Sequence, residues 1–295
     1  MIERLGGKVI MLSKKDTMSQ WVHAHPQLNL RCVHCHEQLQ FLPYQWKCIN
    51  GHSFDVAKQG YTFLSKRPSD SPYQKELFEL RRKVICNSLF YHKLHVLIRE
   101  ELAELKSPTI IDAGSGEGSH LWKISQNIEQ ATCVAMDISK DGILLSTDYN
   151  ADQLHIVADL SDIPLMDQQC DLILSVLSPS NYEEFNRILK RDGRIIKVIP
   201  NSGYLREIRD KMVQQGWLKR HEYDNYLVVE TFLKHYPQAD IHQVSDHVKL
   251  SHEMVQAVVE MTPLTWNLKP NQRRVLAELI GDTITLDVSV AIYHK

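Results

Sequence analysis

The chain has 295 residues, of which 43% are hydrophobic and 24% charged, and its formal net charge is −2. This length and composition predict a globular protein of about two domains and exclude a disordered or fibrous chain. No apolar run approaches the roughly 18 residues that a membrane span needs, and the N-terminal KVIML is too short for a signal-peptide core, so we expect a cytoplasmic protein with no membrane partner.

The charge is unevenly distributed along the chain. Residues 1–100 contain 15 Lys and Arg against 8 Asp and Glu, a balance of +7, whereas residues 101–295 contain 19 against 28, a balance of −9. Such asymmetry is typical of a protein in which one lobe meets a polyanion. An uneven solvated surface gives the same pattern, so charge alone leaves both interpretations open.

The first motif along the chain is a cluster of cysteine and histidine between residues 32 and 52. Cys32, Cys35, Cys48 and His52 follow the spacing Cys-x2-Cys-x12-Cys-x3-His, which is typical of a four-coordinate zinc site. The intervening QFLPYQWKC predicts a short hairpin, and the following turn NGH returns His52 toward the metal. No ligand position is left for a substrate, so the predicted Zn²⁺ is structural and stabilises a module too small for its own core.

Two alternatives accompany the zinc interpretation. Disulfides would explain the cysteines, but a cytoplasmic chain disfavours them. His34 and His36 lie beside the ligands and are substitutes in principle, although His34 falls within the first Cys-x2-Cys turn, where side chains usually point outward.

The second motif is a glycine-rich turn between a strand and a helix. TIID (109–112) predicts a short buried strand, SHLWKIS (119–125) predicts a helix, and Gly114, Gly116 and Gly118 separate them. A dinucleotide fingerprint would place its third glycine at 119, where Ser119 stands. The pattern Asp-x-Gly-x-Gly-x-Gly, which begins at Asp112, is instead typical of S-adenosyl-L-methionine (SAM) methyltransferases.

Two further acids support a SAM site, because each ends a predicted strand. ATCVAMDIS (131–139) places Asp137 where a carboxylate can accept hydrogen bonds from both ribose hydroxyls. HIVADLSDIPL (155–165) places Asp159 where the adenine amino group would lie. Carboxyl ends of parallel strands meet at one edge, so these acids and the glycine turn predict one cofactor site.

The remaining pattern predicts the fold class: α/β, a doubly wound, Rossmann-like SAM-methyltransferase sheet with a small N-terminal zinc-binding module. CDLILSVLS (170–178) predicts a fourth buried strand. YEEFNRILKRDGRIIKVIP (182–200) predicts a helix, a turn at Asp192-Gly193 and a fifth strand, and TITLDVSVAIYH (283–294) predicts a terminal strand that pairs with another.

Four stretches in this order resemble the ribosomal RNA guanine-N1 methyltransferases of the RlmA type, over about residues 28–295. They are the zinc module with HSFDVAKQGYTFLS (52–65), the linker and helix SDSPYQKELFELRRKVICNSLFYHKL (69–94), the SAM-binding pattern, and EMTPLTWN (260–267). The sequence departs from the family pattern at Ser69, at the SPS of 178–180, and at Tyr204, where the family often has histidine.

The resemblance implies a function. Members methylate N1 of one guanine in a hairpin of the large-subunit (23S) ribosomal RNA and use SAM as the methyl donor. The resemblance also implies a homodimer. It also implies that Tyr91, Gly116, Glu117 and Tyr204 line the cofactor pocket. For Tyr91, a core aromatic at helical spacing from His95 is an equally good interpretation.

These inferences divide the chain into four parts. They are an N-terminal extension (1–27), a zinc-binding and rRNA-recognition module (28–66), a linker with helices (67–106) and a SAM-dependent methyltransferase domain (107–295). Cations and aromatic side chains in and after the module suit an RNA hairpin. They are Arg31, Lys47, Lys58, Lys66, Arg67, Arg81, Arg82 and Lys83, with Tyr44, Trp46, Tyr61 and Phe63 interleaved. Some of these aromatics must instead form the small module's core.

Two other classes of protein stay open at this point. A small-molecule SAM methyltransferase would share the C-terminal pattern but has less use for a basic zinc lobe. A non-catalytic zinc RNA-binding protein would not bind SAM. The sequence leaves open the modified guanine, the catalytic base, the oligomeric state, any link to antibiotic resistance, and whether translation starts at Met1 or Met11.

Overall fold

A computed structural model describes residues 2–5, 8–68, 73–126, 128–149, 152–219 and 224–295. Its contacts divide the chain into two compact units. The first comprises Met1–Tyr73, Glu104–Arg194 and Lys295, and the second comprises Gln74–Ala103 and Ile195–His294. The start of the predicted linker, residues 69–72 with Ser69, lies outside the described residues.

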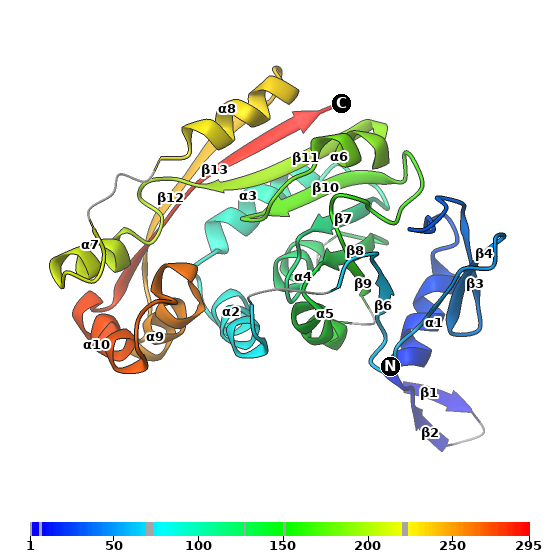
Figure 1. Ribbon diagram of the computed structural model, residues 1–295, viewed down its shortest axis with the longest axis horizontal. Helices are drawn as coiled ribbons and strands as arrows, with labels where there is room; N and C mark the ends of the chain where they lie inside the picture. The colour runs from blue at the N-terminus through cyan, green and yellow to red at the C-terminus, as the bar shows by residue number, and fades with distance from the viewer. Residues whose placement is uncertain (1, 6–7, 69–72, 127, 150–151, 220–223) are drawn as a thin grey trace. The chain divides into compact units, whose positions relative to one another are not determined.

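The first unit contains a parallel sheet with the strand order β10-β7-β8-β9-β6. These strands are β6 (Thr62–Leu64), β7 (Thr109–Ala113), β8 (Thr132–Asp137), β9 (Gln153–Ala158) and β10 (Cys170–Val176). Every residue of β7 and β9 is buried, as expected for parallel strands covered on both faces. Helices α4 (Ser119–Ser125) and α5 (Lys140–Ser146) pack against β8, and α5 also reaches β9 (Figure 1). The 3-10 turn η1 (Thr147–Tyr149) and helix α6 (Tyr182–Ile188) complete this part.

A second, antiparallel sheet in the same unit forms the zinc module. It has the order β3-β4-β5, with β3 (Leu39–Leu42), β4 (Gln45–Cys48) and β5 (Ser53–Asp55). The predicted hairpin is confirmed: Leu39 faces Cys48, and Tyr44 takes a positive φ of 60° at the turn. Trp46 is buried in the module, Tyr61 is buried against Ile143 and Val157 of the parallel sheet layer, and Tyr44 is exposed.

Strand β6 was not predicted as part of the catalytic sheet. It follows the zinc module directly and runs parallel to β9, with Leu64 opposite Ala158. Its three residues are too few to show a period in the sequence. The module thus supplies the edge strand of the sheet that carries the predicted cofactor site.

The N-terminal extension contains the hairpin β1 (Ile2–Leu5) and β2 (Lys8–Met11) and helix α1 (Lys14–Ala24). A capping box between Ser13 and Asp16 starts α1, whose buried side chains include Met18 and Trp21. Helix α1 packs against β9, and its Lys14 bonds Asp148 at 2.6 Å. The extension is therefore part of the first unit.

The second unit has the strand order β12-β13-β11, of which β11 (Leu189–Pro200) contributes its residues from Ile195 onward. Strands β12 (Asp240–Lys249) and β13 (Thr283–His294) pair antiparallel over their length, as predicted for the terminal strand (Figure 1). Its helices are α2 (Lys75–Asn87), α3 (His92–Leu102), α7 (Arg206–Gln214), α8 (Tyr226–His235), α9 (His252–Met261) and α10 (Pro270–Ile280), with the 3-10 turn η2 (Pro263–Thr265). None of the helices in the described part of the chain is both long and apolar enough to cross a bilayer.

The predicted turn at Asp192-Gly193 is wrong. Strand β11 (Leu189–Pro200) begins directly after α6 and continues through both residues into the second unit. The Gly193 carbonyl accepts a hydrogen bond from the Lys295 N–H at 2.9 Å, so the backbone is paired here. Tertiary pairing has overridden the local turn preference of an Asp-Gly pair.

Candidate cofactor and zinc sites

The glycine turn after β7 has the geometry that its sequence predicts. Gly114, Gly116 and Gly118 all have positive φ, of 81°, 56° and 73°. A Cβ on Gly114 would lie 2.6 Å from Cβ of Ser178, so only glycine fits this close approach. The Ser178 hydroxyl in turn donates to the Ala113 carbonyl at 2.6 Å, which holds the turn against the end of β10.

The structure brings Asp137 against this turn. Its carboxylate accepts hydrogen bonds from the Gly116 N–H at 2.8 Å and from the Ser139 N–H at 2.7 Å. The strands carrying these groups are in parallel register, with Ala113 opposite Met136. The acid predicted to hold the ribose therefore also fixes the backbone of the glycine turn.

Asp159 lies one position beyond the end of β9, at the same edge of the sheet. Its Oδ1 accepts the Ser161 N–H at 2.8 Å, and its Oδ2 lies 3.1 Å from the Arg67 guanidinium. Because Asp137 pairs with Val157, the two acids occupy neighbouring strand ends. Asp112 and Glu117 are buried in the same unit. Seven of the nine predicted cofactor residues thus belong to one strand-end edge and its glycine turn.

The other two, Tyr91 and Tyr204, lie together in the second unit. Their hydroxyls are 2.8 Å apart, and Tyr91 is buried at the start of α3. Asp287 of β13, which sequence reasoning missed, holds the turn before Tyr204 by accepting the Gly203 N–H at 2.9 Å. Their contact with the cofactor stays a prediction.

The four predicted zinc ligands converge. One ligand atom from each of Cys32, Cys35, Cys48 and His52 lies within 4.8 Å of every other. His52 Nδ1 is 3.6 Å from the Cys32 Sγ and 3.4 Å from the Cys48 Sγ, and the Cys35 and Cys48 Sγ atoms are 3.7 Å apart. Tetrahedral zinc with ordinary bond lengths requires edges of about 3.8 Å between sulfurs and about 3.5 Å from sulfur to nitrogen.

The environment of the thiols also suits a cation. A hydrogen bond with the Asn50 side chain, helped by the Glu37 backbone, lowers the pKa of the Cys35 thiol to about 6. Burial raises the pKa of the Cys32 thiol, so a thiolate there needs a metal charge beside it. The sulfur separation is far longer than the 2.03–2.05 Å of a disulfide. The residues fit structural zinc.

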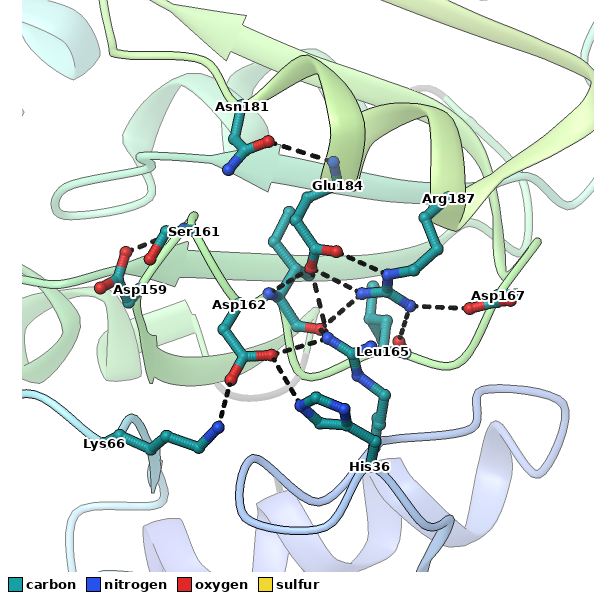
Figure 2. A network of polar contacts seen from close by, with 12 residues as sticks. His36, Lys66, Asp159, Ser161, Asp162, Leu165, Asp167, Asn181, Glu184 and Arg187 are labelled. Atoms are coloured by element: carbon teal, nitrogen blue, oxygen red, sulfur yellow. Dashed lines mark hydrogen bonds and ion pairs between the residues drawn. The ribbon is translucent and has the colours of Figure 1, made fainter.

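Several of the predicted RNA-binding cations are engaged within the molecule. One acidic partner is Asp162, which lies 2.7 Å from the Arg31 guanidinium and 3.1 Å from the Lys66 ammonium. Figure 2 shows the polar contacts around Asp162. Arg67 pairs with Asp159, and Lys83 of α2 pairs with Glu253 of α9 at 2.5 Å. Sequence reasoning missed these acidic partners because no fixed spacing marks them.

Comparisons with known proteins match both regions of the chain in which these residues lie. A family model described as RlmA, N-terminal, a zinc ribbon, matches residues 30–64, and one described as methyltransferase domain matches residues 111–197. The chain is 36% identical over 252 residues to the putative 23S rRNA (guanine-N(1)-)-methyltransferase YxjB of Bacillus subtilis (strain 168), covering 83% of this chain and 89% of that protein.

Two further relatives have related names. The 23S rRNA (guanine(748)-N(1))-methyltransferase of Streptomyces fradiae is 28% identical over 89% of this chain and 95% of its own length. A putative 23S rRNA (guanine-N(1)-)-methyltransferase of Micromonospora griseorubida is 24% identical over 91% of this chain and 98% of its own.

The sheet, the glycine turn with its strand-end acids, and the cysteine cluster define a SAM-dependent methyltransferase that carries a zinc ribbon. Within this class, the chain belongs to the family of 23S rRNA (guanine-N1) methyltransferases. The predictions of the fold class, the family, the enzyme class and both cofactors are confirmed.

Proposed function

We propose that this protein transfers a methyl group from SAM to N1 of a guanine in a hairpin of 23S ribosomal RNA, in the cytoplasm and as a homodimer. One observation carries the proposal. The first compact unit contains both the predicted SAM site at the strand ends and the zinc ribbon. The names of the relatives support the substrate.

The cofactor residues have separate tasks in this proposal. Asp137 accepts hydrogen bonds from the ribose hydroxyls while it holds the Gly116 backbone. Asp159 accepts from the adenine amino group. The turn of Gly114, Gly116 and Gly118 admits the cofactor to the sheet edge, with Asp112 of β7 before the turn and Glu117 within it. Tyr91 and Tyr204 supply a hydroxyl pair to the methionine or target-base side.

The reaction itself demands placement. Bound SAM would supply an activated methyl group on its sulfonium, and the protein would hold nitrogen N1 of the guanine in line with that group. Guanine N1 is protonated and paired in a duplex, so the base must be unpaired or flipped, and its N1 proton must leave. The chain's contribution is to orient the base and exclude water.

The ribbon docks the RNA in this proposal, as the rRNA-recognition module of residues 28–66. Lys47 and Lys58 are exposed on it, and exposed Tyr44 has Lys15 over its ring at 4.8 Å. Cations of this kind neutralise phosphates, and an exposed ring can stack on an unpaired base.

The test is methyl transfer from tritiated SAM to 23S rRNA isolated from a strain that lacks the enzyme. We expect incorporation into 23S rRNA, and a reverse-transcriptase stop at one guanine, because N1-methylguanine cannot pair. Asp137→Ala is the inactive control. Transfer to small-molecule extracts with none to rRNA would contradict the proposal.

A further inference from the structure

The segment that follows β9, residues 159–166, forms strand-like backbone hydrogen bonds with the zinc ribbon. The Arg31 N–H donates to the Pro164 carbonyl at 3.1 Å, and the Met166 N–H donates to the Asn29 carbonyl at 3.0 Å. Between them, Leu30 and Leu165 form an antiparallel bridge, and both side chains are fully buried. Residues 164–166, at the end of this segment, are therefore paired to the ribbon by backbone and by packing.

Three ribbon side chains, Arg31, His36 and Lys66, add contacts to Asp162, and Arg31 makes the shortest of them. The Arg31 side chain is only 12% exposed, and its guanidinium lies 2.7 Å from Asp162 and 3.4 Å from Glu184 of α6. Glu184 also accepts the Ile163 N–H at 2.6 Å, and Arg187 bonds both Glu184 oxygens at 2.7 Å (Figure 2). Without Arg31, Glu184 would keep its pair with Arg187 and Asp162 its pair with Lys66, but the contact that joins the two acids to the ribbon strand would be lost.

The same short turn contains the acid assigned to adenine. The Asp162 N–H donates to the Asp159 carbonyl at 3.0 Å, so one backbone hydrogen bond joins these two residues. A cavity of about 200 Å³ lies beside them, with Val33 and Arg67 of the ribbon side among its lining residues. The ribbon is thus one wall of the space next to Asp159.

We propose that Arg31 is a positioning residue for the cofactor: it ties the zinc ribbon to the post-β9 turn and so holds the Asp159 carboxylate where the adenine amino group binds. This inference rests on the proposed role of Asp159. It gives the ribbon a second task besides RNA docking, and it makes cofactor selection depend on a residue beside a zinc ligand.

The experiment compares two ligands that differ only at the base. S-adenosylhomocysteine carries the 6-amino donor, whereas S-inosylhomocysteine carries an oxygen acceptor that faces the Asp159 carboxylate. We expect the native protein to prefer the adenine ligand by about ten- to a hundredfold in calorimetric Kd, the range for a hydrogen bond to a charged group. Arg31→Met should reduce this preference at least about fivefold while zinc content is unchanged. A loss of fold stability alone would weaken both ligands equally and leave the ratio intact.

Three variants complete the design. Arg31→Lys keeps a charge beside Asp162 and should recover part of the preference. Lys47→Met removes an exposed ribbon cation and should leave the ratio at the native value. In an Asp159→Ala background, Arg31→Met should change the ratio no further, because the group that it positions is gone.

Native discrimination by an Arg31→Met protein that retains its zinc would overturn the inference. If that variant does not fold, Asp162→Asn removes the Arg31 ion pair, together with that of Lys66, with little change of shape, and unchanged discrimination there overturns the inference equally. Equal affinity of the native protein for both ligands would overturn the Asp159 assignment together with this inference. The rRNA methylation assay tests the proposed reaction separately.

Discussion

The core strands β7–β9 and the zinc ribbon belong to one contact unit, yet different forces stabilise them. All residues of β7 and β9 are buried, and each buried Val, Leu or Ile side chain contributes about 1.5–3 kcal/mol. The ribbon strands alternate or are mostly exposed, and β5 has no buried residue. Its order depends on four metal ligands and on ion pairs such as Arg31–Asp162. Apolar burial tolerates exchange of similar side chains, whereas ligands and ion pairs tolerate very little.

The largest expected effect separates the two regions by removing the metal. Cys48→Ser removes one of the four zinc ligands and should release the metal. The effect is large because a structural zinc site contributes on the order of 10 kcal/mol to folding. We expect the ribbon to unfold while β7–β9 stay folded, and SAM binding to weaken because β6 and Arg31 leave the sheet edge. Metal analysis and calorimetry measure both results. Cys86→Ser, outside the cluster, is the control, and equal zinc in the Cys48 variant would refute the ligand set.

A single methyl group tests the cofactor edge. Gly114→Ala places a Cβ 2.6 Å from Ser178 at a φ of 81°, and strain and overpacking together should cost about 2–5 kcal/mol. Gly216→Ala is the matched control, because φ is 69° there but no atom lies within 4 Å. Chemical denaturation should show a much larger loss for Gly114. Similar losses would mean that only backbone strain matters.

A carboxylate deletion tests the proposed ribose contact of Asp137. Asp137→Ala removes the acceptor of the Gly116 N–H and of the ribose hydroxyls. It should weaken the binding free energy of SAM by about 1.5–3 kcal/mol. NADH should not compete. Glu129→Ala, an exposed acid of the same unit, should bind SAM normally. An unchanged dissociation constant for the Asp137 variant would remove the ribose assignment.

One buried histidine of the core, His155, should make the stability of the first unit depend on pH. Burial lowers the pKa of the His155 imidazole to about 3, below its unfolded value of about 6.5. Between these pH values the unfolded chain binds more protons, so the free energy of unfolding decreases as the pH is lowered, by up to about 1.4 kcal/mol per pH unit. His155→Leu should remove that part of the slope in urea unfolding from pH 7 to 4. Ser146, bonded to His155 Nδ1 at 2.7 Å, still donates to Ile143 in the variant. An unaltered slope would contradict a neutral His155.

The smallest effect concerns the ribbon surface. Reversing Lys47 and Lys58 to Glu should weaken RNA binding and leave SAM affinity unchanged. The slope of log binding constant against log salt concentration should become shallower by up to about 1.4–1.8. Filter binding at several salt concentrations measures the slope. Lys234→Glu, on α8, is the control reversal. An unchanged slope would leave the ribbon with its cofactor role alone.

Sequence patterns predicted the core strands well because their physical signals are local. The helix predicted at 119–125 has the bounds of α4, and the strand predicted before it matches β7 within one residue. Glycine, aspartate and continuous apolar runs mark these elements without help from tertiary contacts. The zinc ligands were equally accessible, since their spacing carries the geometry.

Other features depend on partners distant in the sequence. Strand β6 has three residues and exists through its pairing with β9. Arg31 was interpreted as a phosphate contact because a sequence shows charge but not the buried acids that meet it. The turn expected at Asp192-Gly193 failed for the same reason, since strand pairing decided that backbone.

The pairing of β6 with β9 also has a consequence for how the chain folds. Thr62 meets Ile156, 94 positions further on, so the sheet edge closes late and through a large loss of chain entropy. Until the ribbon is ordered, β9 presents an open edge, the kind of surface on which chains aggregate. We therefore expect zinc availability during refolding to determine yield as well as activity, with metal-free refolding producing aggregates that late addition of zinc does not rescue.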